Sequence, residues 1–276
     1  MKNNNRKLLG DESNFASINE QSKNDDQFLL NIIHDLRSYL NVITSAAQYM
    51  EHNTYENDKN LKYIEIIKRN GFKMLKLINN LIDSNKIKNN YYLLNKKNIN
   101  IVPMIENTIS CIEKYASERN ISLIFDTNEE DCVMAIDPEA IDRVVMNLLS
   151  NAIKFSEDNS NIYINLLVKE DTIELSFKDE GCGITKEEKE KIFERFYQGK
   201  NNDNIEGSGI GLNLCMLFVN AHDGKILLDS EINKGSTFTV VLPRKIDENI
   251  ETVEEENDLI NKNQALEIEF SDTYRL

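Results

Sequence analysis

The chain of 276 residues carries a histidine within a strongly apolar segment, FLLNIIHDLRSYLNVI, at residues 28–43. His34 is followed directly by Asp35. A neutral imidazole is a good nucleophile near neutral pH. A carboxylate that accepts a hydrogen bond from one ring nitrogen leaves the lone pair of the other nitrogen free to attack. The pair therefore predicts a nucleophilic histidine, although a lone helical histidine is more often a surface residue without a chemical role.

A second group of polar residues repeats at helical spacing. Its members are Arg143, Asn147, Asn151 and Lys154, which share one side of a helix because three or four residues separate them. A helix face that only contacts water usually carries Glu, Lys or Gln, whereas Asn is a mediocre helix former. Amide oxygens suit a hard cation, and an ammonium group suits a phosphate. The pattern favours a binding face over a solvated one.

The motif DEGCGI at residues 179–184 combines a carboxylate with two glycines. Asp179 continues an inward alternation of apolar residues that ends with Phe177, so its side chain is predicted to be buried. A buried carboxylate is costly unless it is hydrogen-bonded, and a purine amino group is one possible donor. Gly181 and Gly183 let a ligand approach the backbone closely. A tight turn without a ligand is the alternative.

A glycine-rich run, GSGIG at residues 207–211, precedes a helix that is predicted to begin near Leu212. The glycines are Gly207, Gly209 and Gly211. They let backbone N–H groups converge on a phosphate at the N-terminus of the helix. A glycine run is a weak signal alone, but its position after the other two motifs indicates a nucleotide site.

These side chains must be positioned by two different architectures, of which the first is helical. Apolar residues at heptad spacing predict two helices joined by a polar turn. The first seam contains Leu29, Ile33, Leu36, Leu40, Ile43, Ala47 and Met50, and the second contains Leu61, Ile64, Ile67, Gly71, Met74, Ile78 and Leu81. One hairpin cannot bury such seams well, so two copies are expected to pair as a four-helix bundle. We expect a disordered segment over residues 1–26 and an all-α dimerisation hairpin over residues 27–90.

The second architecture mixes helices with alternating strands. Helices are expected at residues 105–119, 137–155 and 212–221, and strands at 121–126, 162–168, 173–177, 225–230 and 236–242. Antiparallel strands with interspersed helices predict an α+β two-layer sandwich, in which one helical layer covers one sheet. This sandwich domain is expected over residues 97–245, which makes the chain a multidomain protein.

The charge is acidic and unevenly distributed. The formal net charge of −15 argues against a nonspecific nucleic-acid-binding protein, which needs a basic surface. Residues 246–276 hold ten acidic residues against two basic ones, so this tail carries −8 of that charge. We expect the tail to be disordered, with docking of residues 259–260 and 265–270 as the less favoured alternative.

The cysteines and the apolar runs indicate a cytoplasmic protein. The four cysteines are scattered and form no CxxC motif, which fits a reducing compartment rather than a disulfide framework or a zinc site. No apolar run approaches the roughly 20 residues of a membrane span. The N-terminal residues contain no apolar signal region.

In their order along the chain, five motifs resemble those of the sensor histidine kinases of two-component systems. They are HDLRSYLNVI for the phosphoacceptor box, NLLSNAIKF for the Asn box, DEGCGI for the first glycine box, IFERFYQG for the Phe box and GSGIGLNL for the second glycine box. The resemblance covers about residues 27–245. It implies a dimeric helical bundle with a Bergerat-type ATPase domain on each subunit, and it implies ATP and Mg²⁺ as cofactors.

The resemblance also implies roles for particular residues. His34 would be the phosphorylated residue and Asp35 its acidic helper. Asn151 would hold Mg²⁺ with support from Asn147. The roles at the nucleotide are then distributed as follows: Lys154 meets phosphate, Asp179 binds the adenine amino group with Gly181 and Gly183 beside it, and Gly207, Gly209 and Gly211 shape the loop around the phosphates.

Three positions depart from the pattern of the family. Tyr39 stands where a proline usually bends the first helix. Ser38 stands where members with phosphatase activity usually carry Thr or Asn, and it keeps a hydroxyl group that could position water. Gln198 stands where many members have a phosphate-binding Arg.

The favoured hypothesis is an ATP-dependent protein-histidine kinase that autophosphorylates His34 and passes the phosphoryl group to an aspartate of a separate response regulator. The expected partners are a second copy of the chain, the response regulator and an upstream sensory protein. A degenerate kinase that binds ATP or a regulator without turnover is the alternative, motivated by Tyr39 and Gln198. An ATPase of the chaperone or mismatch-repair type is disfavoured because such proteins lack a phosphoacceptor helix.

Overall fold

The computed structural model describes residues 33, 35–50, 57–89, 91–199, 208–250, 252–253 and 259–273. By its internal contacts the chain divides into two compact units, residues 1–74 and 75–276. Helix α2 (Asn57–Lys88) begins in the first unit and ends in the second. Among the described residues, no helix combines the length and the apolar character that crossing a membrane requires.

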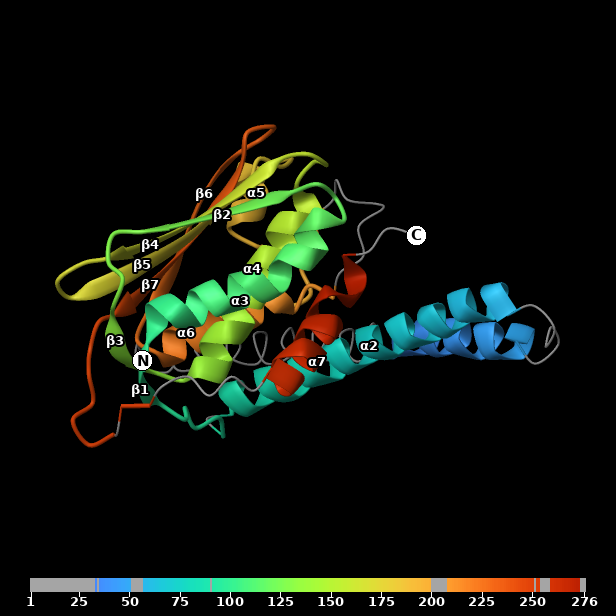
Figure 1. Cartoon of the computed structure of the whole chain (residues 1–276), viewed down its shortest axis with the longest axis horizontal. Coiled ribbons are helices and arrows are strands. Elements are labelled where there is room, and N and C mark those ends of the chain that lie inside the picture. The colour runs from blue at the N-terminus through green and yellow to red at the C-terminus, as the bar shows by residue number, and fades with distance from the viewer. Residues whose placement is uncertain are drawn as a thin grey trace, which may run out of the picture. The chain divides into compact units, whose positions relative to one another are not determined.

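The first unit is the predicted helical hairpin (Figure 1). Residues 35–50 are helical, and the first part of α2 follows them. The rings of Tyr49 and Tyr63 lie 4.3 Å apart, and the ammonium of Lys73 lies 5.8 Å from the ring centroid of Tyr39. Contacts at both ends of the pair show that the helices run antiparallel.

The apolar seams of the hairpin are only partly covered within one chain. Leu40 is 53% exposed, and Leu61 and Ile64 are 66% and 49% exposed. Ala46, by contrast, is buried. The hairpin therefore presents a row of large apolar side chains to its surroundings, as the heptad pattern predicts for a helix pair that lacks a partner.

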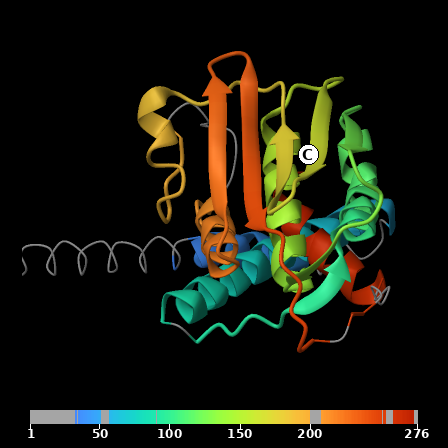
Figure 2. The same ribbon diagram turned by 90° about the vertical axis from the view of Figure 1, so that its left-hand side faces the viewer.

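The second unit is an α+β two-layer sandwich, which confirms the predicted fold class. The strand order of the sheet is β2 (Ser122–Thr127), β4 (Asn161–Val168), β5 (Thr172–Lys178), β7 (Gly235–Pro243) and β6 (Lys225–Glu231). Helices α3 (Ile101–Ser117), α4 (Pro138–Phe155) and α6 (Gly211–Ala221) form the helical layer on one face of the sheet (Figures 1 and 2). Apolar side chains of both layers share one core.

Helix α4 begins and ends where the sequence predicts. The carboxylate of Asp137 accepts a hydrogen bond from the backbone N–H of Ala140 at 3.2 Å, and Pro138 occupies the first turn, where its missing N–H costs nothing. Ser156 is in an extended conformation and ends the helix. Leu148 and Leu149 are buried in the core, whereas Arg143, Asn151 and Lys154 are half-buried.

The sheet is mixed rather than purely antiparallel. β2 pairs with β4 in parallel, whereas the other strand pairs are antiparallel. Between β2 and β4 the chain passes through α4, and a connection of that length is what a parallel pair requires. Short strands β1 (Lys97–Asn100) and β3 (Val133–Ile136) form a separate antiparallel pair that the alternation pattern did not reveal.

Asn98 anchors the beginning of the sandwich. The buried amide of Asn98 donates hydrogen bonds to the carbonyls of Asp247 and Ile250, both at 2.7 Å. It also accepts one from the N–H of Asp247 at 3.0 Å. These bonds join the start of the sandwich to the segment that follows its strand β7.

The prediction that residues 246–276 are disordered is wrong for part of this tail. Residues Leu259–Glu269 form helix α7, and Phe270–Asp272 form the short helix η1. Leu266 and Phe270 are fully buried, and the ring of Phe270 stacks on Tyr115 of α3 at 4.6 Å. The acidic composition suggested solvation, but two apolar side chains one turn apart are enough to dock the helix on the helical layer.

Candidate functional site

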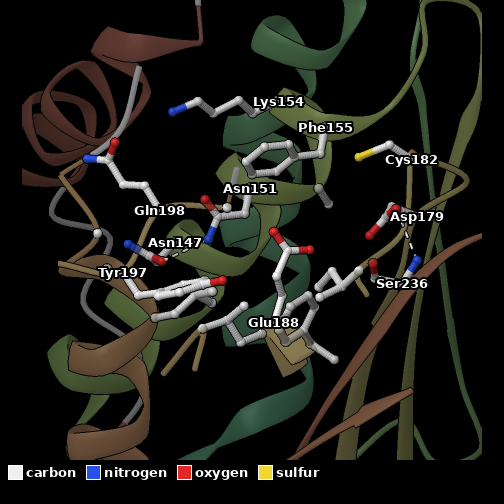
Figure 3. A pocket seen from close by; sticks show the side chains of 18 of the residues that line it. Asn147, Asn151, Lys154, Phe155, Asp179, Cys182, Glu188, Tyr197, Gln198 and Ser236 are labelled. Carbon is white, nitrogen blue, oxygen red and sulfur yellow. Dashed lines mark hydrogen bonds between the residues drawn. The ribbon is translucent and has the colours of Figure 1, made fainter. Parts of the chain in front are cut away.

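A cavity of about 310 Å³ lies in the second unit, at one side of α4. It is within the size range of small-molecule sites, roughly 300–1,000 Å³. Side chains from α4, from the loop after β5 and from residues 188–198 converge on it (Figure 3). Of the residues predicted from the sequence, the structure brings Asn147, Asn151, Lys154, Asp179, Gly183, Gly209 and Gly211 to this cavity.

The polar residues of α4 have two different sets of neighbours. Asn147, Asn151 and Lys154 line the cavity. Arg143, one turn earlier, instead forms an ion pair with Asp83 of α2 and donates a hydrogen bond to Asn80 at 3.2 Å. The predicted polar face of α4 is therefore present. Its first member, Arg143, contacts α2 rather than the cavity.

The two asparagines are linked to each other. The Nδ2 of Asn151 donates to the Oδ1 of Asn147 at 3.3 Å (Figure 3). The Nδ2 of Asn147 donates to Glu269 at 3.1 Å. With these assignments the Oδ1 of Asn151 remains the amide oxygen available to a ligand. Since Mg²⁺ prefers oxygen ligands, the arrangement fits the predicted metal role of this residue.

Asp179 is buried at the end of β5, as its alternation predicts. Its Oδ1 accepts hydrogen bonds from the N–H groups of Gly181 at 2.9 Å and Ser236 at 3.2 Å. Burial raises the pKa of this carboxyl group, and the two backbone N–H groups counteract part of that rise. Because both bonds use Oδ1, Oδ2 remains to accept a hydrogen bond from a ligand, such as one from an exocyclic amino group.

The glycines permit close backbone packing around the cavity. Gly183 has φ +71°, and a Cβ there would lie 2.1 Å from the carbonyl oxygen of Glu231. A Cβ on Gly181 would lie 2.4 Å from the carbonyl oxygen of Phe155. Gly181 and Gly183 therefore let the loop after β5 pack closely against its neighbours. This packing fixes the position of the Asp179 side chain in the cavity.

Replacing Gly211 with Ala is expected to weaken, by roughly tenfold or more, the binding of the ATP that the family resemblance implies. A Cβ at this position would lie 2.4 Å from the Nδ2 of Asn147, so the amide must move and its bond to Asn151 is disturbed. Titration with a fluorescent ATP analogue measures the effect. Gly71→Ala is the matched control, since a Cβ on Gly71 meets nothing within 4 Å. Equal affinity of Gly211→Ala and the wild type would contradict the assigned role of Asn147.

Other residues at the cavity were not predicted from the sequence. Thr185 caps helix α5 (Lys186–Lys189), and Glu188 accepts hydrogen bonds from the backbone N–H and the hydroxyl of Thr185 at 3.3 and 2.9 Å. The spacing T-x-x-E is a readable capping box, so this turn could have been found. Lys76 and Asn80 of α2 also line the cavity. They lie far away in the sequence, and no local pattern marks them.

Two parts of the predicted site fall outside the described residues. His34 is one of them, while Asp35 is helical and half-buried and Ser38 is helical and exposed. Gly207 is the other, since the description resumes at Ser208. The roles of these residues in phosphoryl transfer remain predictions.

Comparisons with known proteins agree with the geometry. Residues 136–246 match the family model described as "Histidine kinase-, DNA gyrase B-, and HSP90-like ATPase". The sensor histidine kinase WalK of Bacillus subtilis is 31% identical over 236 residues, which cover 83% of this chain and 38% of WalK. This chain thus spans well under half of that relative.

Solved structures show the same folds. The catalytic domain of the histidine kinase ThkA matches with a TM-score of 0.50 and 29% identity, over 54% of this chain and 98% of that domain. ThkA in complex with the response regulator TrrA matches with a TM-score of 0.59 and 22% identity, over 85% of this chain and 64% of that chain. Residues 136–246 therefore belong to the histidine kinase-, DNA gyrase B- and HSP90-like ATPases, within a chain that is similar to sensor histidine kinases over most of its length.

Proposed function

We propose that the chain is an ATP-dependent protein-histidine kinase, which phosphorylates His34 and transfers the phosphoryl group to an aspartate of a separate response regulator. The observation that carries the proposal is the cavity in which Asn151, Lys154 and Asp179 converge, within a domain of an ATPase family. The similarity to sensor histidine kinases extends beyond this domain and supports the kinase assignment over a bare ATPase.

The cavity can hold ATP in one orientation. The Oδ2 of Asp179 accepts a hydrogen bond from the adenine amino group at the end of β5. At the other end, the Oδ1 of Asn151 would hold Mg²⁺, and the ammonium of Lys154 attracts the phosphates. A bound Mg²⁺ would neutralise charge on the phosphate oxygens. The residues of the chain thus distinguish the base end of the cavity from the phosphate end.

Phosphoryl transfer then requires a nucleophile in line with the γ-phosphorus. A nitrogen of His34 forms the new P–N bond, and the bond between the γ-phosphorus and the bridging oxygen breaks, so that ADP leaves with that electron pair. Asp35 accepts a hydrogen bond from the other ring nitrogen and stabilises the positive charge that the ring acquires. An aspartate of the receiver domain later takes the phosphoryl group and frees the imidazole. Ser38 is proposed to position water for the opposing phosphatase reaction.

The direct test is incubation of the full chain with γ-labelled ATP and MgCl₂, followed by addition of purified receiver domains. We expect label on the chain that acid removes and alkali leaves in place, and its transfer to one receiver domain. Absence of such label under conditions where ATP binds would overturn the kinase assignment.

A nucleotide-binding protein without turnover is the second candidate, and one observation favours it. Gln198 lines the cavity beside Tyr197, where many sensor histidine kinases carry an arginine (Figure 3). Arg195 does not line the cavity, and its guanidinium donates to Asn85 at 3.4 Å. The labelling experiment separates the candidates, because this one predicts ATP binding without phosphohistidine.

The exposed seam of the hairpin supports a homodimer, and Leu61→Asp is expected to raise the dimer dissociation constant by about a hundredfold or more. Leu61 is 66% exposed in one chain, and each dimer would bury two copies of it. Full burial of a leucine contributes about 1.5–3 kcal/mol. Sedimentation velocity over a range of concentrations measures the change. Lys62→Asp introduces an aspartate one position off the seam and serves as the control. Equal dissociation constants for Leu61→Asp and the wild type would contradict this interface.

A further inference from the structure

The C-terminal segment, defined as residues 259–273, places Asp272 at the phosphate end of the cavity and Glu269 against two side chains that line it. Asp272 accepts hydrogen bonds from Lys76 at 2.8 Å and from Lys154 at 3.1 Å. Glu269 lies 3.2 Å from the ammonium of Lys76 and accepts a hydrogen bond from Asn147 at 3.1 Å. Two residues of the proposed nucleotide site, Lys154 and Asn147, are thus engaged by the chain itself.

The C-terminal segment is held there by contacts outside the cavity. Leu266 and Phe270 are fully buried, and Phe270 stacks on Tyr115. Lys262 forms an ion pair with Asp142 of α4 at 3.2 Å. Apolar burial supplies the affinity of this docking, and the same segment carries Asp272 into the cavity lining and Glu269 to Lys76 and Asn147. The docked helix therefore delivers its carboxylates at defined positions.

The charges around Asp272 are closely balanced. Burial would raise the pKa of Asp272, but Lys76 and Lys154 hold it well below its usual range. Burial would lower the pKa of Lys76, but Asp272 and Glu269 raise it overall. The side chains of Lys76 and Lys154 are 14% and 9% exposed, so water screens these pairs only weakly. Two ammonium groups and two carboxylates thus lie together here, and their formal charges cancel.

We propose that the C-terminal segment is an autoinhibitory element, which competes with the phosphates of the nucleotide for Lys154 and Lys76. This proposal rests on the proposed function, in which Lys154 meets phosphate. With the segment docked, an approaching triphosphate meets two carboxylates and a cluster without net positive charge. With the segment released, the same triphosphate meets two ammonium groups in a partly buried site. Release of the segment is therefore expected to accompany nucleotide binding.

The binding of a fluorescent ATP analogue in the presence of MgCl₂ tests the competition in the full chain. The double variant Glu269→Gln/Asp272→Asn keeps the shapes of the side chains but removes both negative charges. This variant is expected to bind the ATP analogue at least about tenfold more tightly than the wild type, because the triphosphate no longer meets two negative carboxylates. The variant Phe270→Ala keeps the charges but loses the apolar anchor, and tighter binding is expected here too.

A matched control removes the same charge elsewhere. Glu129 and Glu130 are exposed in the loop between β2 and β3, and Glu129→Gln/Glu130→Gln should leave the affinity unchanged. Circular dichroism confirms that each variant is folded. Unchanged binding by the Glu269→Gln/Asp272→Asn variant would overturn the proposal. Weaker binding would overturn it too, because these carboxylates would then contribute to the nucleotide or metal site.

Hydrogen exchange gives a second readout in the wild-type chain. Addition of the nucleotide with MgCl₂ is expected to increase amide exchange at residues 259–273, because the segment is displaced. Slower exchange there would overturn the proposal. If neither the wild type nor any variant binds the nucleotide, the proposed function fails as well, whereas binding that does not respond to the C-terminal variants overturns only this inference.

Discussion

His34→Gln is expected to abolish autophosphorylation, with labelling from γ-labelled ATP reduced by roughly a thousandfold or more. Glutamine keeps a polar side chain but has no nucleophilic nitrogen, so the P–N bond cannot form. Nucleotide binding should be unchanged, because the cavity lies among residues of the second unit. Label retained after separation of the protein on a denaturing gel measures the first effect, and titration with a fluorescent ATP analogue measures the second.

His52→Gln is the matched control, because it makes the same substitution elsewhere in the N-terminal part of the chain. The third histidine, His222, is unsuitable. Its Nδ1–H donates to the carbonyl of Phe218 at 2.8 Å, and its Nε2 accepts from the N–H of Asp137 at 3.0 Å. Burial also lowers its pKa, so it serves as a neutral structural link. Equal labelling of His34→Gln and wild type would remove His34 from the mechanism.

Asp179→Asn is expected to weaken ATP binding by about a hundredfold or more. The oxygen of the substituted amide would still accept the hydrogen bonds from Gly181 and Ser236, so the amide nitrogen must face the ligand. A donor would then face the adenine amino group, which is also a donor, and neither could find a partner in a buried site. Isothermal titration calorimetry with a non-hydrolysable ATP analogue measures the loss.

A change of base provides a sharper form of the same experiment. Inosine triphosphate carries a carbonyl oxygen in place of the amino group, so the Asp179→Asn variant should bind it better relative to ATP than the wild type does. Glu180→Gln is the neighbouring control, since Glu180 is exposed. An Asp179→Asn variant that keeps the wild-type preference for ATP would show that this carboxylate does not recognise adenine.

The local elements of the ATPase unit could be predicted because their signals are local. Asp137 and Pro138 mark the start of α4 within four residues, and the alternation around Phe177 identifies β5 and the inward direction of Asp179. Each signal follows from backbone geometry, in which the helical and strand periods decide which side chains share a face. The parallel pairing of β2 with β4 was missed because it depends on the route of the whole intervening chain.

The candidate site shows the same division. Asn147, Asn151 and Lys154 were found because one helix carries them at regular spacing. Lys76 and Asp272 were not found. The Nζ of Lys76 lies 2.8 Å from the Oδ1 of Asp272 in the structure, but the two residues are 196 positions apart in the sequence. No periodicity links residues at that separation, and only the docking of α7 beside α2 makes them neighbours.

The sequence by itself determined the helical hairpin, the sandwich domain and the identity of the residues with chemical potential, because these depend on short-range periodicity and on residue type. Only the tertiary structure decided that Arg143 turns toward α2, that part of the acidic tail folds and docks, and that carboxylates reach the proposed phosphate end of the cavity. Those outcomes depend on which apolar surfaces remain uncovered after the core has formed. Phe270 stacks on Tyr115 because α3 has an apolar surface that the rest of the core does not cover. This apolar contact places the nearby carboxylates of the tail.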